Sequence, residues 1–327
     1  MLGRLMLAGA ALTLTAATEP WRWTLPTGVQ APHVPADNLM SAAKVELGRR
    51  LFYDADLSAD GTMACATCHE QHRAFADGNA THGGVHGDPG RRNVPGLANV
   101  AWMRTLTWGN PRLTSLELQA VVPVTGKTPV EMGMAGQEAE IARRLARDAC
   151  YRTMFTRAFP DEGTIDFAHV VRALAAFERS LVSFDSPYDA WTRGDRTALS
   201  PDALKGAALF RRSCSSCHSG PLLSDGGFHK ILPPSATDPG LREITSRPSD
   251  LGRFRTPSLR NVEITGPYFH DGSTKTMADA VRRHPRMSAI ATSDLAALTT
   301  FMTGLTDRKF TRDERFSLPG EACGKRL

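Results

Sequence analysis

The sequence predicts a mainly α-helical protein made of two related domains. The chain has 327 residues, more than a single hydrophobic core usually supports, and its hydrophobic content of 41% is ample for two cores. A short motif of cysteine and histidine occurs twice, once in each half. Each copy follows the same helix ending and precedes a similar loop. Because self-similarity of this kind indicates a duplicated unit, we expect two helical modules in one chain.

The chain opens with a stretch typical of a signal peptide. "MLGRLMLAGAALTLTAATEP" has one arginine, an apolar run from Leu5 to about Leu12, and small residues at Ala16 and Ala17. Such a run is too short to span a bilayer, and no later segment reaches the roughly 18 apolar residues that a membrane helix needs. We therefore expect residues 1–17 to be removed on export to the periplasm, and no stable membrane insertion.

The repeated elements follow the same order in both halves. The helix endings share Gly-x-x-Leu-Phe, in "LGRRLF" (47–52) and "KGAALF" (205–210). The loops place proline, leucine and asparagine in one register, in "RRNVPGLANV" and "RFRTPSLRNV". Beyond each loop an amphipathic segment opens with a hydroxyl residue, Ser115 in the first half and Thr276 in the second. Each half is thus expected to contain a helix, the motif, a loop and a further helix.

Four of the six cysteines predict two covalently bound haems. They lie in "CATCH" (Cys65, Cys68, His69) and "CSSCH" (Cys214, Cys217, His218). Two residues between the cysteines allow both sulfurs to form thioethers to one haem, and the next histidine is held under the iron. A zinc site or a thioredoxin-like motif would not require a histidine after each pair. We therefore expect two c-type haems, with His69 and His218 as proximal ligands.

The other two cysteines, Cys150 and Cys323, leave two alternatives open. The periplasm permits a disulfide that ties the C-terminal tail to the first domain. Two free buried thiols are the other possibility.

The two halves differ at the position where a second axial ligand is expected. The eighth residue after Ser115 is Pro123, and the eighth after Thr276 is His284. If this segment covers the distal face of its haem, the second haem is closed by an imidazole, whereas proline cannot bind iron. An open haem suits peroxide and a closed one suits electron transfer. Met287 is an alternative ligand for the second haem.

Peroxide cleavage also needs a group that moves a proton between the two oxygens. Glu131 lies in a loop after Pro123, and Gln119 lies one helical turn before that proline. Trp108 lies in a turn before the same segment, where it is a candidate electron path between the haems. On spacing alone, each of these residues is also compatible with an ordinary surface or core position.

These motifs together resemble the bacterial di-haem cytochrome c peroxidase and MauG family. The stretches that support the resemblance are "LGRRLFYDADLSADGTMACATCHEQHRAFAD", "RRNVPGLANVAW", "PVEMG", "CSSCH" and "FRTPSLRNVEITGPYFHDG", which cover nearly the whole mature chain. Within the family, the stretch from Leu106 to Gly133 is most similar to the di-haem enzymes of methanobactin gene cassettes, the MbnH-like group.

The resemblance implies two cytochrome c-like domains, residues 18–190 with the peroxidatic haem and 191–327 with the electron-transfer haem. It implies catalytic roles for Glu131, Gln119, Pro123 and Trp108. It also implies a calcium ion between the domains, held by the Asn93 side chain and by the carbonyls of Thr265 and Pro267; ligation by oxygen alone suits calcium.

The sequence departs from the family's peroxidases and from MauG at the second haem, where these have methionine and tyrosine in place of His284. A haem with two histidine ligands should have a lower potential than one with histidine and methionine. In other family members, a histidine in the loop after the first haem motif caps that haem until reduction. His82 and His86 are candidates for this role here.

Three functions are compatible with this resemblance. The favoured one is an enzyme that uses hydrogen peroxide to form a high-valent di-haem state and oxidises a residue, preferably tryptophan, of a partner protein such as a copper-associated one. The second is a cytochrome c peroxidase that takes electrons from a small redox protein. The third, a di-haem electron carrier, has no use for a distal acid. The balance of 39 basic and 34 acidic residues gives no reason to expect nucleic acid as a partner.

Overall fold

The structure, a computed structural model, describes residues 21–233, 235 and 237–326. The expected signal peptide, residues 1–17, lies outside the described residues. Within the described part of the chain, no helix is long and apolar enough to cross a membrane. The architecture is mainly helical, as predicted, with two short antiparallel strand pairs.

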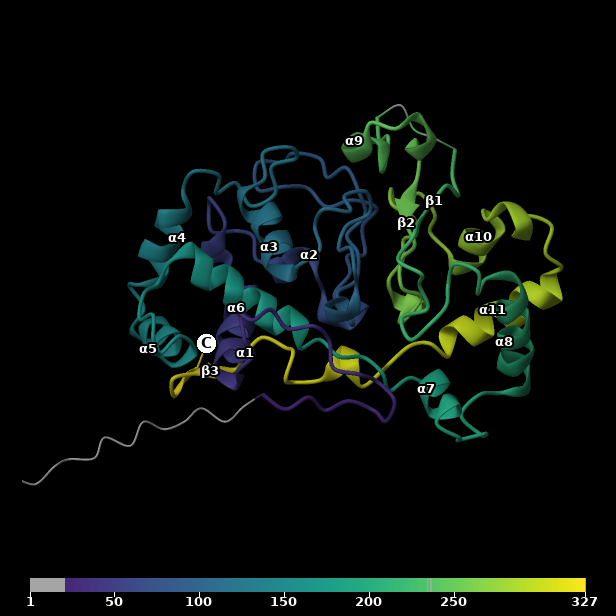
Figure 1. Ribbon diagram of the computed structural model, residues 1–327, viewed down its shortest axis with the longest axis horizontal. Helices are drawn as coiled ribbons and strands as arrows, with labels where there is room; N and C mark the ends of the chain where they lie inside the picture. The colour runs from purple at the N-terminus through teal and green to yellow at the C-terminus, as the bar shows by residue number, and fades with distance from the viewer. Residues whose placement is uncertain (1–20, 234, 236, 327) are drawn as a thin grey trace, which may run out of the picture.

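Two groups of helices lie side by side and are joined by loops (Figure 1). The first group consists of α1 (Ala42–Phe52), α2 (Cys65–Cys68), α3 (Leu116–Thr125), α4 (Glu138–Leu145), α5 (Ala149–Ala158) and α6 (Phe167–Arg179). The second consists of α7 (Pro187–Thr192), α8 (Pro201–Ser213), α9 (Arg242–Thr245), α10 (Met277–Arg282) and α11 (Thr292–Thr303). Strands β1 (Phe228–His229) and β2 (Phe254–Arg255) pair in the second group, and β3 (Glu321–Ala322) pairs with β4 (Lys325–Arg326) at the C-terminus.

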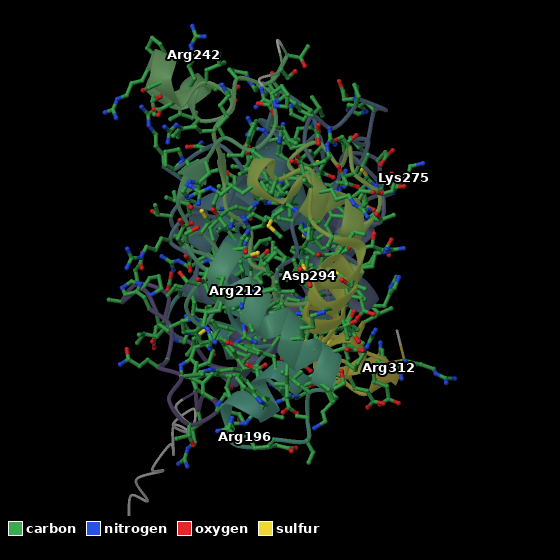
Figure 2. All side chains as sticks on the ribbon, turned by 90° about the vertical axis from the view of Figure 1, so that its right-hand side faces the viewer. Arg196, Arg212, Arg242, Lys275, Asp294 and Arg312 are labelled. Atoms are coloured by element: carbon green, nitrogen blue, oxygen red, sulfur yellow. A yellow bond between two sulfur atoms is a disulfide. The ribbon has the colours of Figure 1, made fainter. Side chains whose placement is uncertain are left out.

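Each group has its own hydrophobic core. In the first, α1 packs on α6, and Phe52 contacts Phe177 with ring centroids 5.2 Å apart. In the second, α8 packs on α11, and Phe210 contacts Phe301 at the same centroid distance, 5.2 Å. Charged side chains, among them Arg196, Arg212 and Lys275, surround the second group on its solvent side (Figure 2).

The glycine of each repeated helix ending allows its helix to approach a partner closely. A Cβ at Gly48 of α1 would meet the carbonyl oxygen of Ala173 in α6. A Cβ at Gly206 of α8 would meet the carbonyl oxygen of Ala297 in α11. The Gly-x-x-Leu-Phe pattern is therefore explained by helix packing: glycine gives room for the crossing, and the phenylalanine enters the core.

Replacing Gly206 with alanine is expected to destabilise the protein by about 1–3 kcal/mol, because the methyl group meets backbone that no side-chain rotation can move. Thermal or denaturant unfolding of the purified protein measures the effect. Gly320 has open space around its Cβ position, so Gly320→Ala is a matched control with an expected change within about 0.5 kcal/mol. Equal stability of the two variants would contradict this account of the α8–α11 crossing.

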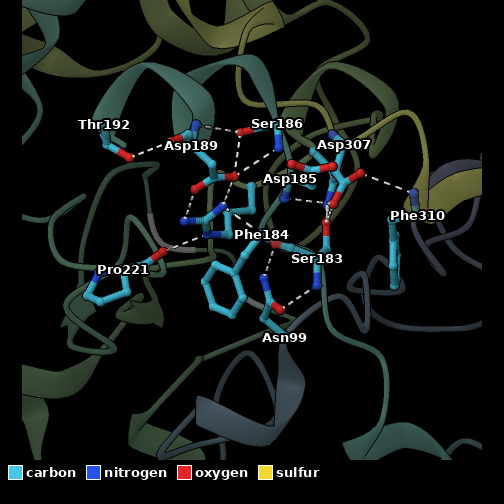
Figure 3. Close-up of polar contacts among 12 residues, drawn as sticks. Asn99, Ser183, Phe184, Asp185, Ser186, Asp189, Thr192, Pro221, Asp307 and Phe310 are labelled. Atoms are coloured by element: carbon cyan, nitrogen blue, oxygen red, sulfur yellow. Dashed lines mark hydrogen bonds and ion pairs between the residues drawn. The ribbon is translucent and has the colours of Figure 1, made fainter. Parts of the chain in front are cut away.

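The asparagine of each repeated loop bonds to chain outside the two cores, and Figure 3 shows this for Asn99 and Ser183. Asn99 has φ of 58°, and its side chain accepts from the Ser183 N–H and donates to the Ser183 carbonyl, both at 2.7 Å. Asn261 has φ of 62°, and its side-chain oxygen accepts from the Asp307 N–H at 2.8 Å. Asparagine suits both places because it tolerates a left-handed backbone and its amide both donates and accepts.

The C-terminal tail returns to the first core. Phe310 and Phe316 are buried in the first core, where the Phe310 ring packs on that of Phe75 with centroids 5.8 Å apart. Cys150 of α5 and Cys323 form a disulfide, with Cα atoms 5.7 Å apart, which resolves the two alternatives that the sequence left open. The chain beyond about residue 310 thus packs with the first group, although it follows the second in sequence.

Candidate functional site

Three histidines have the same ring orientation, with Nδ1 directed at a backbone carbonyl. His69 Nδ1 lies 2.7 Å from the Phe75 oxygen, His218 Nδ1 3.1 Å from the Leu223 oxygen, and His284 Nδ1 2.9 Å from the Ala280 oxygen. A carbonyl can only accept, so each Nδ1 donates and Nε2 is left with its lone pair. This is the usual arrangement of a metal-binding histidine.

Local backbone structure explains the first two of these contacts. His69 and His218 each follow their two cysteines directly, and each chain then turns back so that a residue with positive φ, Phe75 at 62° or Leu223 at 51°, presents its carbonyl. Burial lowers the pKa of both imidazoles, that of His218 to about 4. Both rings are therefore neutral, as an iron ligand must be.

His284 lies opposite His218. The two ring centroids are 6.5 Å apart. Two imidazoles on opposite sides of one metal ion, each bonded through Nε2 at about 2 Å, place their centroids roughly 6 Å apart. His284 follows α10, whose first turn is capped by the Thr276 hydroxyl accepting from Asp279 N–H. The geometry of the pair fits an iron held from both sides, and Met287 lines the same space one 3₁₀ turn later.

A cavity of about 540 Å³ contains this histidine pair. It is lined mainly by apolar side chains, together with the thiols of Cys214 and Cys217. Residues of the first group also line it, among them Asn93 and Trp108. The size, the two thiols and the paired imidazoles fit a covalently attached haem.

In the first group, α3 and the loop after it form the corresponding distal segment. The Ser115 hydroxyl caps α3, as Thr276 caps α10, and Pro123 lies inside the helix. The following loop folds back, because Met132 N–H donates to the Pro123 oxygen at 2.9 Å and Met134 N–H to the Val124 oxygen at 2.9 Å. These bonds hold Glu131 beside the end of α3, with half-buried Gln119 one turn earlier on that helix.

The surroundings of Glu131 raise the pKa of its carboxyl group. Burial raises the pKa of Glu131, and His82 opposes the shift. Burial also raises the pKa of the Cys68 thiol to about 12, and the nearby Glu131 carboxylate adds to that shift. Glu131 therefore lies on the side of the first haem motif, with a pKa closer to the working range of an acid–base catalyst than that of an exposed glutamate.

The loop with the two candidate capping histidines packs against the Glu131 segment. Val85 N–H donates to the Glu131 oxygen at 2.7 Å. His82 Nδ1 lies 2.8 Å from an oxygen of Asp77, whose side chain is fully buried, whereas His86 is exposed. The contact between His82 and Asp77 was not predicted from the sequence. The position of Asp77 in "FADG", shortly after the first haem motif, could have suggested a role for it near that motif.

Trp108 lies between the two groups. Its indole N–H donates to the Asn93 oxygen at 2.8 Å, and its own carbonyl accepts from the Arg255 N–H at 2.8 Å. Only 8% of its surface is exposed. The buried indole is thus bonded within the first half, and the Trp108 backbone is bonded to the second half, so this residue lies at the contact between the halves.

The three residues expected to bind calcium line one cavity. Asn93 is buried, and its Nδ2 donates to the carbonyls of Asn79 and Ala80 at 3.1 and 3.2 Å, which leaves Oδ1 as a free acceptor among the described contacts. Thr265 and Pro267 flank Gly266 on the same cavity wall. Oxygen donors of this kind fit a hard cation such as calcium.

Comparison with known proteins agrees with this arrangement. Residues 42–197 match the family model described as di-haem cytochrome c peroxidase. The chain is 36% identical over 294 residues to the methylamine utilization protein MauG of Methylophilus methylotrophus, covering 87% of this chain and 86% of that protein. It is 34% identical over 272 residues to cytochrome c551 peroxidase of Nitrosomonas europaea, covering 80% and 79%.

The fold also matches solved structures. The crystal structure of a MauG-like protein associated with microbial copper homeostasis superposes with a TM-score of 0.86 at 36% identity, covering 92% of this chain and all of that one. The di-haem peroxidase BthA of Burkholderia thailandensis superposes with a TM-score of 0.70 at 25% identity, covering 89% and 91%.

Proposed function

Since this chain belongs to the di-haem cytochrome c peroxidase and MauG family, and is thus a peroxide-dependent di-haem oxidoreductase, we propose that it oxidises a residue of a partner protein, as a MauG-like enzyme. The observation that supports this proposal most is the pairing of His284 with His218, at 6.5 Å between ring centroids. Two imidazoles favour a low potential, which suits a haem that is not held reduced by a cytochrome c donor.

In this proposal the two halves have different tasks. The first half has Pro123 at the position matching His284, so its haem site has room for peroxide. The haems, when bound, supply the redox chemistry. Hydrogen peroxide accepts two electrons and two protons to become two waters, and the partner residue supplies the two electrons.

The chain's own residues handle the proton and the electrons. Glu131 is placed to move a proton between the two peroxide oxygens, because burial raises its pKa and the folded-back loop holds it beside Pro123. Gln119 offers an amide to orient the peroxide. Trp108, bonded to both halves, provides the route for electrons between the haem sites.

Several structural assignments belong to the same proposal. We infer two domains with a boundary near residue 190, related by an internal repeat that the matching Gly48 and Gly206 contacts support. We infer one calcium ion at Asn93, Thr265 and Pro267 between them. Export to the periplasm follows from the N-terminal stretch and agrees with the disulfide.

The partner is proposed to be a copper-associated protein that presents a tryptophan. This assignment is supported by similarity over nearly the full chain to the MauG-like protein associated with microbial copper homeostasis. A mass shift on a co-expressed partner, located by peptide mapping, is the measurement that identifies the partner and the residue oxidised.

The function is tested by adding hydrogen peroxide to the fully oxidised protein in a stopped-flow spectrophotometer. We expect rapid oxidation by two equivalents without prior reduction. A requirement for prior reduction, followed by fast turnover with ferrous cytochrome c, would instead establish the second candidate, a cytochrome c peroxidase. His82 is the feature that favours this second candidate, because its Nδ1 is held by Asp77 and its Nε2 has no partner among the described residues, as a histidine that caps the first haem until reduction would need.

A further inference from the structure

The structure buries four arginines within its described residues, and one of them has no acidic partner. These are Arg50, Arg179, Arg255 and Arg260. Arg50 pairs with Asp148, Arg179 with Glu117 and Arg260 with Asp189. Arg255, with 4% of its surface exposed, forms no ion pair with any described residue. A buried charge without a counter-ion is costly, so this exception calls for a ligand.

Arg260 allows a direct comparison, because it lies only five residues after Arg255, in the loop that follows β2. The Arg260 guanidinium makes two parallel hydrogen bonds to Asp189, each 2.9 Å long (Figure 3 shows Asp189). The Arg255 guanidinium donates only to neutral acceptors: the Thr107 oxygen at 3.1 Å, the Thr256 oxygen at 3.3 Å and the Met103 sulfur at 3.7 Å. These bonds use Nε and Nη1, and Nη2 has no acceptor among the described residues.

Arg255 also lines the 540 Å³ cavity that contains His218 and His284. Its guanidinium carbon lies 6.0 Å from the centre of the Trp108 ring, at the contact between the two halves. Burial lowers the pKa of Arg255 to about 10, so the side chain stays charged at neutral pH. Lys230 and Arg286 also line this cavity, but both are exposed, whereas Arg255 is a buried positive charge that forms no ion pair with a described residue and lies beside the proposed electron route.

The group that would enter this cavity has anionic ends. A haem bonded through its vinyl edge to Cys214 and Cys217 has its two propionates on the opposite edge, away from the cysteines. The cavity extends from these thiols to Trp108 and Arg255 at the domain contact. We propose that Arg255 binds a propionate of the second haem and that its charge raises the reduction potential of that haem.

This proposal extends the site to a residue for which the motifs predicted no role. It rests on the presence of the second haem, and not on the oxidation of a partner. The charge acts in one direction: a positive group near a haem favours the ferrous form, which has one positive charge fewer. Arg255 thus partly offsets the low potential expected from two histidine ligands.

The test compares three variants of the haem-loaded protein by spectroelectrochemical titration of the second haem. Arg255→Gln is expected to lower the ferrous-to-ferric ratio about tenfold or more at a fixed potential, which is a shift of about 59 mV for one electron. Arg255→Lys retains the charge and is expected to recover most of the shift. Arg253→Gln removes an equal charge two residues away, from a side chain that is 44% exposed, and is expected to change the potential little.

A pyridine haemochrome assay first counts the haems in each variant. If Arg255→Gln binds two haems and its second haem titrates like that of Arg253→Gln, the proposal is wrong. If Arg255→Gln binds fewer than two haems, Arg255→Lys decides: two haems at a potential near that of the unmodified protein support the proposal. Equal haem loss in both Arg255 variants would show that the positive charge at position 255 does not explain haem binding, and would overturn the proposal.

Discussion

Replacing Glu131 with glutamine is expected to slow the reaction with hydrogen peroxide by roughly 100-fold or more. Glutamine keeps the size of the side chain but cannot exchange a proton in this pH range. The carboxyl is held by a loop that is bonded to the end of α3 through Met132, so the variant should fold normally. Stopped-flow measurement of the second-order rate with peroxide gives the effect directly.

The pH profile provides an independent check of the same role. Burial raises the pKa of Glu131 above that of an exposed glutamate. The base form that accepts the first proton is therefore lost as the pH falls through this raised pKa, and the rate should decline at a higher pH than for an unperturbed carboxyl. In Glu131→Gln this part of the profile should disappear.

Glu138→Gln is the matched control. Glu138 lies at the start of α4, and its side chain accepts from Gly136 N–H, which a glutamine oxygen can also do. The Glu138→Gln substitution makes the same chemical change seven residues away from Glu131. The rate of reaction with hydrogen peroxide should therefore stay within about twofold of that of the unmodified protein. An unchanged rate in Glu131→Gln would remove this glutamate from the mechanism.

Replacing His284 with glycine is expected to convert the second haem from low spin to high spin. The His284 ring stands 6.5 Å from that of His218 and has Nε2 free, so its loss opens one axial position. Electron paramagnetic resonance of the oxidised protein should show one low-spin signal lost and a high-spin signal gained. The haem count should stay at two, because the cysteines and His218 are untouched.

Met287→Ala separates the two candidate ligands. Met287 lines the same cavity and lies three residues after His284. If the histidine is the ligand, the methionine variant keeps the low-spin signal. The opposite pattern, with the signal lost in Met287→Ala and retained in His284→Gly, would assign the ligand to methionine and remove the main support for the proposed function.

The expectations about His284 and Pro123 came from counting eight residues from a helix cap, and the structure contains both caps. Both helices begin directly after a hydroxyl cap, Ser115 or Thr276, whose side chain accepts from the third residue beyond it. An N-cap sets the phase of the helix that follows. The two segments therefore share a register as far as Arg282, where α10 ends; His284 lies beyond that helix, whereas Pro123 is still inside α3.

The sequence by itself determined the features that depend on a few neighbouring residues. The spacing of Cys65, Cys68 and His69 specifies haem attachment, because the sulfur and imidazole positions follow from one short turn. The repeated glycine pattern likewise indicated a duplicated helix ending, and the structure adds the reason for it, because a Cβ at Gly206 would meet the carbonyl oxygen of Ala297. Family membership followed from the combination of such local motifs.

Only the tertiary structure decided which distant groups meet. It brings Cys150 to Cys323 across 173 positions and, among the described residues, leaves Arg255 as the buried arginine without an acidic partner while Arg260 has Asp189. Sequence could not determine these contacts, because the cost of burying a thiol or a charge depends on its surroundings after folding. The same local motif, "RFRTPSLRN", contains both arginines, and only the folded chain distinguishes their roles.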